Sequence, residues 1–206
     1  MKFTNNSNTT FYYYLDKFAN LVLLNLLALF CSIPIITIGA TATSLHYAVT
    51  KLVNDEPKPF QAFFRSFKQN FIQSTIIWLL LSLIGFGVIV CVWFSQYINN
   101  VILTIVATFS LFVWFAIISW IFPLLSKFYF KTQDAIKNAF LCAVSCWPIT
   151  LLMVITNFLP FVIFVISIDI FLRIGFIWIV IWFSLATLCN SRLLKKPFET
   201  LEASIS

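Results

Sequence analysis

Residues 71–95 read FIQSTIIWLLLSLIGFGVIVCVWFS, a run that contains no charged side chain. A helix needs about 20 mainly apolar residues to cross the hydrocarbon core of a bilayer, which is about 30 Å thick. A second uncharged run covers residues 101–125, and the short polar turn at 96–100 separates it from the first. These two runs predict a pair of antiparallel transmembrane helices.

The composition of the whole chain agrees with this local prediction. Of the 206 residues, 61% are hydrophobic, 18% are aromatic and only 10% are charged. Soluble domains are about 45–50% apolar and about 25% charged, so a water-soluble fold of this size would expose too much apolar surface. Four glycines in the chain also argue against a β-barrel with many turns. The predicted fold class is therefore all-α: a polytopic membrane helix bundle that forms a single domain over residues 1–206.

Three further apolar stretches complete the predicted set of transmembrane helices. One of them contains Pro148 and Pro160, which predict a kink or a break because proline lacks a backbone N–H and clashes with the preceding turn. The five predicted spans are 18–38, 71–95, 101–125, 140–166 and 171–190.

Lysine and arginine determine the expected orientation, because cytoplasmic loops carry an excess of these residues. With five crossings, ten of the thirteen basic residues fall on one side, and only Lys2, Lys17 and Arg173 fall on the other. This distribution predicts a cytoplasmic C-terminus and an N-terminus outside. Pro34 leaves an alternative open: if the first apolar region is re-entrant, the N-terminus lies inside and the other spans keep their orientation.

Phenylalanines recur at helical spacing just before residues 71–95, with basic residues between them. This pattern is typical of an amphipathic helix that lies along the membrane, with its rings buried and its cations facing phosphate head groups. We expect a cytoplasmic surface helix here, with Phe63 and Phe67 facing inward, and a second one at 132–140. The first is a candidate docking surface for the membrane or a protein partner, and its residues are Phe60, Phe63, Phe64, Arg65, Phe67, Lys68 and Phe71.

Several uncharged polar residues lie in or next to the predicted spans, and such groups usually form hydrogen bonds between helices. They would also be able to line a path for a sugar. His46 is the only histidine in the chain, and with no second ligand nearby in the sequence we expect it to be structural. The polar residues in question are Asn25, Ser32, Thr37, Thr41, Ser44, Thr156 and Asn157.

No catalytic, cofactor or metal site is expected. The sequence contains no phosphate-binding glycine loop, nucleophile elbow or metal-binding motif. Cys142 and Cys146 are one helical turn apart, but a buried cysteine pair is more typical of packing than of metal binding. Because the basic residues separate the apolar runs instead of forming one patch, nucleic-acid binding is also not expected. The chain is predicted to be non-enzymatic.

Residues 32–45, after the first span, read SIPIITIGATATSL, and the acidic turn at 55–56 and the segment FKQNF at 67–71 follow. This combination resembles the YesL family of small bacterial membrane proteins. The family pattern P-x-x-T-x-G-x-A is approximated by Pro34, Thr37, Gly39 and Ala42, with Thr41 intervening. In physical terms, Pro34 frees a carbonyl that Thr37 or a neighbouring helix can bond, and Gly39 allows helices to approach closely. This predicts a bend between the first span and a surface helix at about 40–53.

The resemblance implies a multi-pass protein of the bacterial plasma membrane, associated with genes for sugar uptake. No catalytic residue carries over, because the family has none assigned. Our leading hypothesis is a non-enzymatic accessory or scaffold component beside the permease subunits of a carbohydrate ABC importer. The alternative is a small stand-alone transporter or channel, for which a homo-oligomer is left open. In either case the lipid bilayer is the principal surrounding partner.

Overall fold

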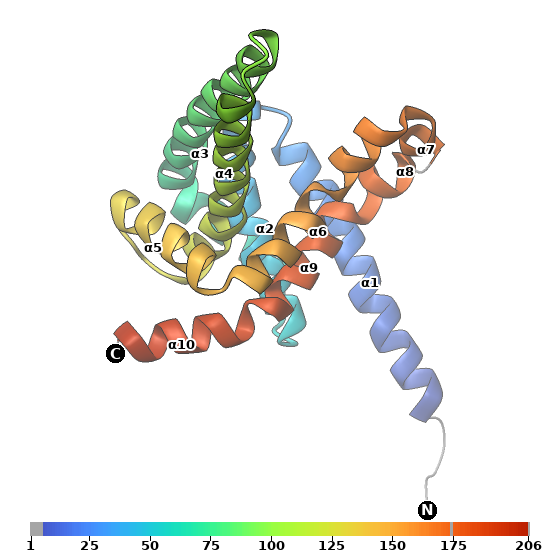
Figure 1. Cartoon of the computed structure of the whole chain (residues 1–206). Coiled ribbons are helices and arrows are strands. Elements are labelled where there is room, and N and C mark those ends of the chain that lie inside the picture. The colour runs from blue at the N-terminus through green and yellow to red at the C-terminus, as the bar shows by residue number, and fades with distance from the viewer. Residues whose placement is uncertain (1–5, 174, 206) are drawn as a thin grey trace, which may run out of the picture.

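The computed structural model describes residues 6–173 and 175–205, and in this part of the chain nearly every residue is helical and none forms a strand (Figure 1). Five helical stretches are long and apolar enough to cross a membrane. The predicted all-α membrane bundle is therefore confirmed. The five stretches are Phe11–Cys31 within α1 (Asn6–Cys31), α3 (Pro59–Tyr97), α4 (Val101–Lys127), α6 (Trp147–Ile166) and Gly175–Leu193.

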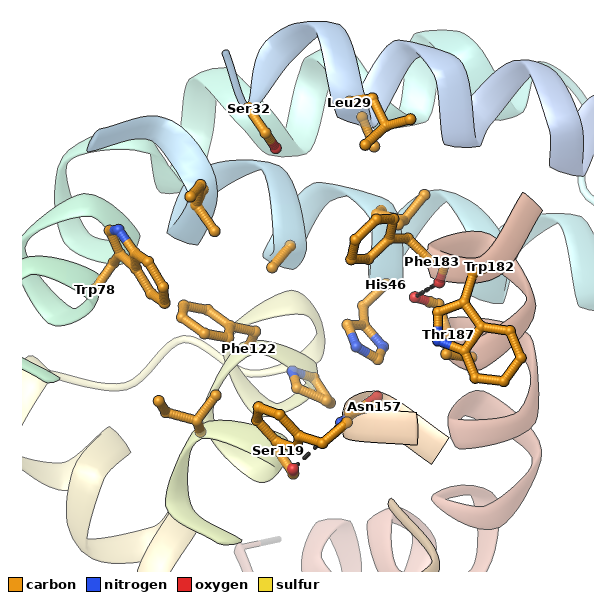
Figure 2. A pocket seen from close by; sticks show the side chains of 18 residues that line it. Leu29, Ser32, His46, Trp78, Ser119, Phe122, Asn157, Trp182, Phe183 and Thr187 are labelled. Carbon is orange, nitrogen blue, oxygen red and sulfur yellow. Dashed lines mark hydrogen bonds between the residues drawn. The ribbon is translucent and has the colours of Figure 1, made fainter. Parts of the chain in front are cut away.

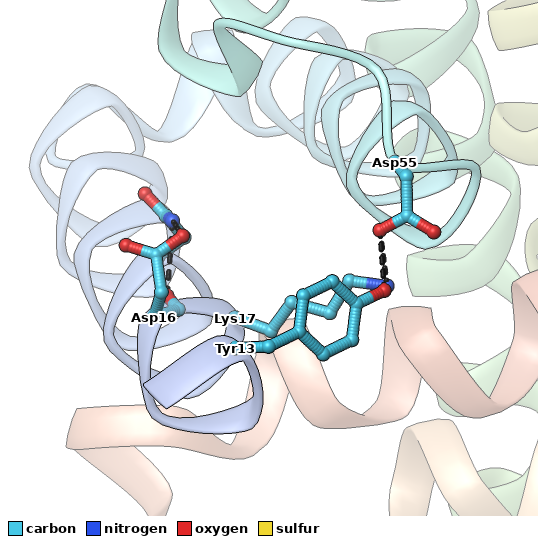
Figure 3. Close-up of polar contacts among 5 residues, drawn as sticks. Tyr13, Asp16, Lys17 and Asp55 are labelled. Atoms are coloured by element: carbon cyan, nitrogen blue, oxygen red, sulfur yellow. Dashed lines mark hydrogen bonds and ion pairs between the residues drawn. The ribbon is translucent and has the colours of Figure 1, made fainter. Parts of the chain in front are cut away.

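The N-terminal region forms a helical hairpin. After α1, the chain turns at Pro34, passes through the 3-10 turn η1 (Ile35–Thr37) and runs back as α2 (Ile38–Val53). Figure 3 shows that the end of α2 lies beside the beginning of α1, where Lys17 Nζ is 2.8 Å from Asp55 Oδ1 and the Tyr13 hydroxyl donates to the same carboxylate. The two helices are therefore antiparallel.

Helix α2 lies in the middle of the bundle, in contact with α1, α3, α4 and α9 (Figure 1). This corrects the expected surface helix at about 40–53. Half of the side chains of α2 are Gly, Ala, Ser or Thr, so neighbouring helices approach it from several sides. At about 1.5 Å per residue the helix is about 24 Å long. Its buried residues are Gly39, Ala40, Thr41, Thr43, Ser44, Leu45, Ala48, Val49 and Leu52.

Helix α3 is one uninterrupted helix of 39 residues, about 58 Å long. The phenylalanine-rich segment at 60–71 is its first third and not a separate surface helix, so the helix that contains the second predicted span begins at Pro59. The physical reason is simple: a proline at the first helical position favours the start of a helix, and no proline or glycine interrupts α3 before Gly85.

The fourth predicted span is divided into two helices. Helix α5 (Thr132–Ser145) ends at Cys146, and α6 starts at Trp147, seven residues later than the expected start at residue 140. Pro148 lies in the first turn of α6, where its missing N–H costs little, but it could not continue α5 without losing a hydrogen bond. The helix 132–145 is thus separate from the span that follows it.

The C-terminal region completes the bundle. The short helices α7 (Ile168–Arg173) and α8 (Gly175–Ile177) precede the π-helical turn η2 (Trp178–Trp182) and α9 (Phe183–Leu193), so the fifth span covers 175–193 instead of 171–190. Helix α10 (Lys195–Ile205) then lies beside the end of α4, where Lys127 Nζ is 2.8 Å from Glu202 Oε1.

Two clusters of buried apolar side chains hold these helices together. One surrounds Phe63 and joins α1, α2 and the start of α3, and the other surrounds Trp120 and joins α3, α4, α5, α6 and α10. The start of α1 and the helix α10 lie at one end of the bundle, at the bottom of Figure 1. The turn between α3 and α4 projects from the opposite end.

Candidate functional site

A cavity of about 340 Å³ lies at the centre of the bundle, where α1, α2, α3, α4, α6, η2 and α9 meet (Figure 2). Pockets that bind small molecules typically measure about 300–1,000 Å³. The walls are largely aromatic and aliphatic, and Trp78, Phe122, Phe158 and Phe183 contribute the largest side chains. Ala42 of the sequence motif also lines this space, which we call the inner cavity.

A chain of hydrogen bonds crosses the wall of the inner cavity. Asn190 Nδ2 donates to Asn157 Oδ1 at 2.7 Å, and Asn157 Nδ2 donates to Ser119 Oγ at 3.2 Å. The Thr156 hydroxyl donates to Asn190 Oδ1 at 3.0 Å. These bonds connect α4, α6 and α9 where no charged group is available, and they satisfy both sides of two amides.

The sequence indicates only part of this series of hydrogen bonds. Asn157 and Thr156 were recognised as polar groups within a span, whereas Ser119 and Asn190 were not. Asn190 is followed directly by Ser191 and Arg192, so it reads as the polar end of a helix. Its burial becomes evident only when α6 and α9 are seen to pack together.

A second cavity, of about 540 Å³, lies next to the first, where the C-terminal ends of α2 and α4 meet the start of α10. We call it the outer chamber. Its lining includes both partners of the ion pairs Lys51–Glu56 and Lys127–Glu202, together with Arg192. The two spaces thus differ in chemistry, since the inner cavity has no Asp, Glu, Lys or Arg in its lining.

His46 lines both the inner cavity and the outer chamber, as does Pro123. Figure 2 shows the His46 imidazole directed into the inner cavity from α2, on the side of Asn157. Within residues 6–173 and 175–205, neither ring nitrogen of His46 has a hydrogen-bond partner. His46, which the sequence predicts to be structural, thus lies at the boundary between the two spaces.

The motif residues shape the turn between α1 and α2. Pro34 precedes η1, and the Thr37 hydroxyl lies 2.5 Å from the Cys31 carbonyl oxygen and 2.7 Å from that of Pro34. Trp78 Nε1 donates to the carbonyl of Ile35 at 2.9 Å, which ties the turn to α3. At Gly39, an added Cβ would overlap the Ser74 carbonyl oxygen and lie 2.6 Å from Trp78 Cβ. The motif thus brings α2 into close contact with α3.

The phenylalanine stripe is divided between the interior and the exterior. Phe63 is completely buried, and its ring stacks on that of Phe67 with 6.1 Å between centroids. Phe60 and Phe67 are half-buried against the same cluster. The outward-facing residues are Phe64, Arg65, Lys68 and Phe71. Only this outward set is accessible to the membrane surface or to a partner.

Among the described residues, no group of three or more His, Cys, Asp or Glu side chains is arranged to hold a metal ion. Burial raises the pKa of Cys142 to about 11, with a smaller contribution from Cys146, so this thiol is protonated at neutral pH. The thiolate is the form of cysteine that binds metals and acts as a nucleophile. Cys142 therefore has the properties of a packing residue.

Comparison with known families gives a match over the N-terminal part of the chain. A family model described as "Protein of unknown function, DUF624" matches residues 21–94, which comprise the C-terminal part of α1, the Pro34 turn, α2 and most of α3. No curated protein and no solved structure matches the chain. The similarity thus covers the hairpin and its contact with α3, and it includes His46 and the motif from Pro34 to Ala42.

Proposed function

We propose that this chain is a non-enzymatic accessory component that packs beside the permease subunits of a carbohydrate ABC importer in a bacterial plasma membrane. The proposal rests on the exposure of the outer half of the α3–α4 hairpin, residues 82–112. Among residues 82–112, only Gly85, Ser95 and Ala107 are buried. In Figure 1 this part of the hairpin projects from the bundle as two helices with no third helix beside them.

The exposed side chains of this hairpin suit a helical partner. They include Phe86, Trp93, Ile102 and Phe109, all more than 65% exposed. Lipid covers such surfaces adequately, but a hairpin that lacks a third helix also gives a partner helix access to two faces. Helices associate in membranes through close packing, and aromatic side chains supply large contact areas. The choice of a sugar importer as this partner rests on the resemblance of the motif at 32–45 to the YesL family.

Photocrosslinking in living cells tests this proposal. A photoreactive amino acid would replace Phe86 or Phe109 in the hairpin and, as a matched control, the exposed Ile155 on α6. We expect crosslinks from the two hairpin positions to an importer permease and none from the control. Crosslinks to lipid alone at all three positions, or equal capture of the permease at Ile155, would refute the lateral contact.

We further propose that both termini lie in the cytoplasm. The antiparallel packing of α1 and α2 supports this, because it brings Lys17 to the same end of the bundle as Asp55, Lys127 and α10. With α2 counted as a short crossing, twelve of the thirteen cations lie on one side and only Arg173 on the other. This agrees better with the positive-inside rule than the ten-to-three distribution of five crossings. We therefore propose a cytoplasmic N-terminus in place of the external N-terminus that five crossings imply.

A second candidate function is transport by the chain alone. The observation that favours it is the adjacency of two cavities, one at membrane depth and one at the charged end. Its test is the flux of labelled sugars into liposomes that contain only this protein. Flux above that of empty liposomes would support an independent transporter. If there is no flux and a permease crosslink is found, only the accessory function is supported.

A further inference from the structure

We propose that the inner cavity and the outer chamber form one binding site for a single-chain amphipathic molecule. Its apolar chain would occupy the inner cavity, and its polar head the outer chamber. This goes beyond the accessory function and does not depend on it, because a bound amphipath can be a structural or regulatory ligand whether or not anything is transported.

The inner cavity selects for an uncharged, flexible chain. Its walls are aromatic and aliphatic, and its polar groups Ser119 and Asn157 already bond to each other. The Thr187 hydroxyl likewise donates to the carbonyl of Phe183 at 2.7 Å. Because burying a charge without a partner costs far more than burying a hydrocarbon, a charged head group would not be stable here.

The outer chamber selects for a polar head with little net charge. Lys51 and Lys127 are each neutralised by a glutamate of the same chamber. Within the described residues, this leaves Arg192, Lys195 and Glu199 of the lining without an ion pair. Two cations and one anion, with hydroxyl and amide groups around them, suit a hydroxylated head that carries one negative charge.

His46 connects the two spaces chemically. Its imidazole lines both of them and lacks a hydrogen-bond partner among the described residues. An amphipath has a polar linkage, such as an ester, where its chain joins its head. That linkage would lie at the boundary between the cavities, where an imidazole N–H is able to donate to it. A buried donor or acceptor left unpaired costs about 1–3 kcal/mol, so a ligand that satisfies His46 gains specificity.

Native mass spectrometry of the purified full chain tests the proposal with a defined probe. The probe is lysophosphatidylglycerol with one saturated 14-carbon chain, and glycerophosphoglycerol serves as the head group without a chain. We expect one probe molecule to be retained at saturation and no retention of the head group alone. Retention of a two-chain phospholipid that the probe does not displace would overturn the single-chain assignment.

Four variants and one control, Ile155→Phe, locate the binding site. Ala42→Phe and Ala186→Phe fill the inner cavity from two different helices, and we expect each to weaken probe binding at least tenfold. His46→Leu should weaken it several-fold, and His46→Gln, which keeps a donor, should recover part of the loss. Ile155→Phe places the same ring on the lipid-facing side of α6 and should have no effect.

The contrary result is also clear. If the two filled-cavity variants are folded and bind the probe as the unmodified chain does, the probe lies on the lipid-facing surface and the proposal is wrong. Folding is checked by the thermal midpoint in detergent. If both phenylalanine variants fail to fold, the comparison of His46→Leu with His46→Gln decides: equal binding by these two and the unmodified chain refutes the site.

Discussion

The two halves of α3 differ in both sequence and environment. Residues 59–81 pack against α2 and η1, and their buried positions include Phe63, Ser66, Ser74 and Ile77. Residues 82–97 are more uniformly apolar, yet only Gly85 and Ser95 are buried there. In a membrane bundle, then, apolar character marks contact with lipid as much as contact with protein. Small and weakly polar residues indicate where helices touch.

A tryptophan in each region should give the largest contrast in stability. Trp120 is completely buried and donates to Thr150 Oγ1 at 2.8 Å, whereas Trp93 is 69% exposed on the outer half of α3. We expect Trp120→Ala to lower the free energy of unfolding by about 3 kcal/mol, because it leaves a cavity, and Trp93→Ala to change it by less than about 0.5 kcal/mol. Equal losses, measured by thermal unfolding in detergent, would contradict the assignment of core and surface.

Two glycines sharpen the same comparison. A side chain at Gly39 would overlap the backbone of α3 at Ser74, whereas nothing lies within 4 Å of a Cβ added at Gly87. Gly39→Leu should therefore cost about 1–3 kcal/mol, toward the upper end because a backbone atom cannot move aside, and Gly87→Leu should be tolerated. Membrane yield and thermal midpoint measure both. The close contact of α2 with α3 is disproved if the two variants behave alike.

The hydrogen-bond chain beside the inner cavity should contribute less. Asn190→Leu removes the partner of both Asn157 and Thr156, and interhelical hydrogen bonds in membranes are worth about 0.6 kcal/mol on average and up to about 1.7 kcal/mol. We expect a loss of about 1 kcal/mol. The control is Thr108→Val in the outer half of α4, which removes only a bond to Thr104 within the same helix. If Thr108→Val lowers the free energy of unfolding as much as Asn190→Leu does, the interhelical hydrogen bonds of Asn190 add no stability.

The smallest effect should come from the polar contact that closes the α1–α2 hairpin. Hydrogen bonds from Lys17 and Tyr13 lower the pKa of Asp55 below its ordinary value of 3.8. The stabilisation by Asp55 is therefore present above its unfolded pKa and is lost as the pH falls through the lower, folded value. Asp55 has a φ of 59°, which asparagine also adopts readily, so Asp55→Asn removes the charge without straining the turn. We expect a small fall in thermal midpoint at pH 7 that high salt removes, and a fall that persists in salt would be inconsistent with an ion pair.

How much of this fold can be predicted from the sequence depends on the element. The predicted span 101–125 lies within α4, because an uncharged run bounded by Asn100 and Lys127 has clear ends. The surface position expected for residues 40–53 is wrong, because the bend at Pro34 does not by itself show whether the helix after it lies along the membrane or returns into the bundle. Its burial follows from the helices around it, and the sequence does not specify which helices become neighbours.

The same limit applies to the candidate site. The sequence flagged Asn157 as a polar residue within a span, but its partners Ser119 and Asn190 are 38 and 33 residues away. His46 was interpreted as structural because no second ligand is near it in the chain. Its position between two cavities follows from the place of α2 at the centre of the bundle, which the sequence does not specify.

The packing of α2 as the returning arm of a hairpin is the central claim, and the side of the membrane on which the N-terminus lies tests it most directly. In a cysteine-free background, single cysteines would be placed at Ser7, Asn99 and Ser126 and treated with a membrane-impermeant thiol reagent in intact cells. The hairpin predicts labelling at Asn99 and protection at Ser7 and Ser126 until the membrane is permeabilised. Labelling of Ser7 in intact cells, with Ser126 still protected, would place the N-terminus outside and contradict the hairpin as a pair of crossings.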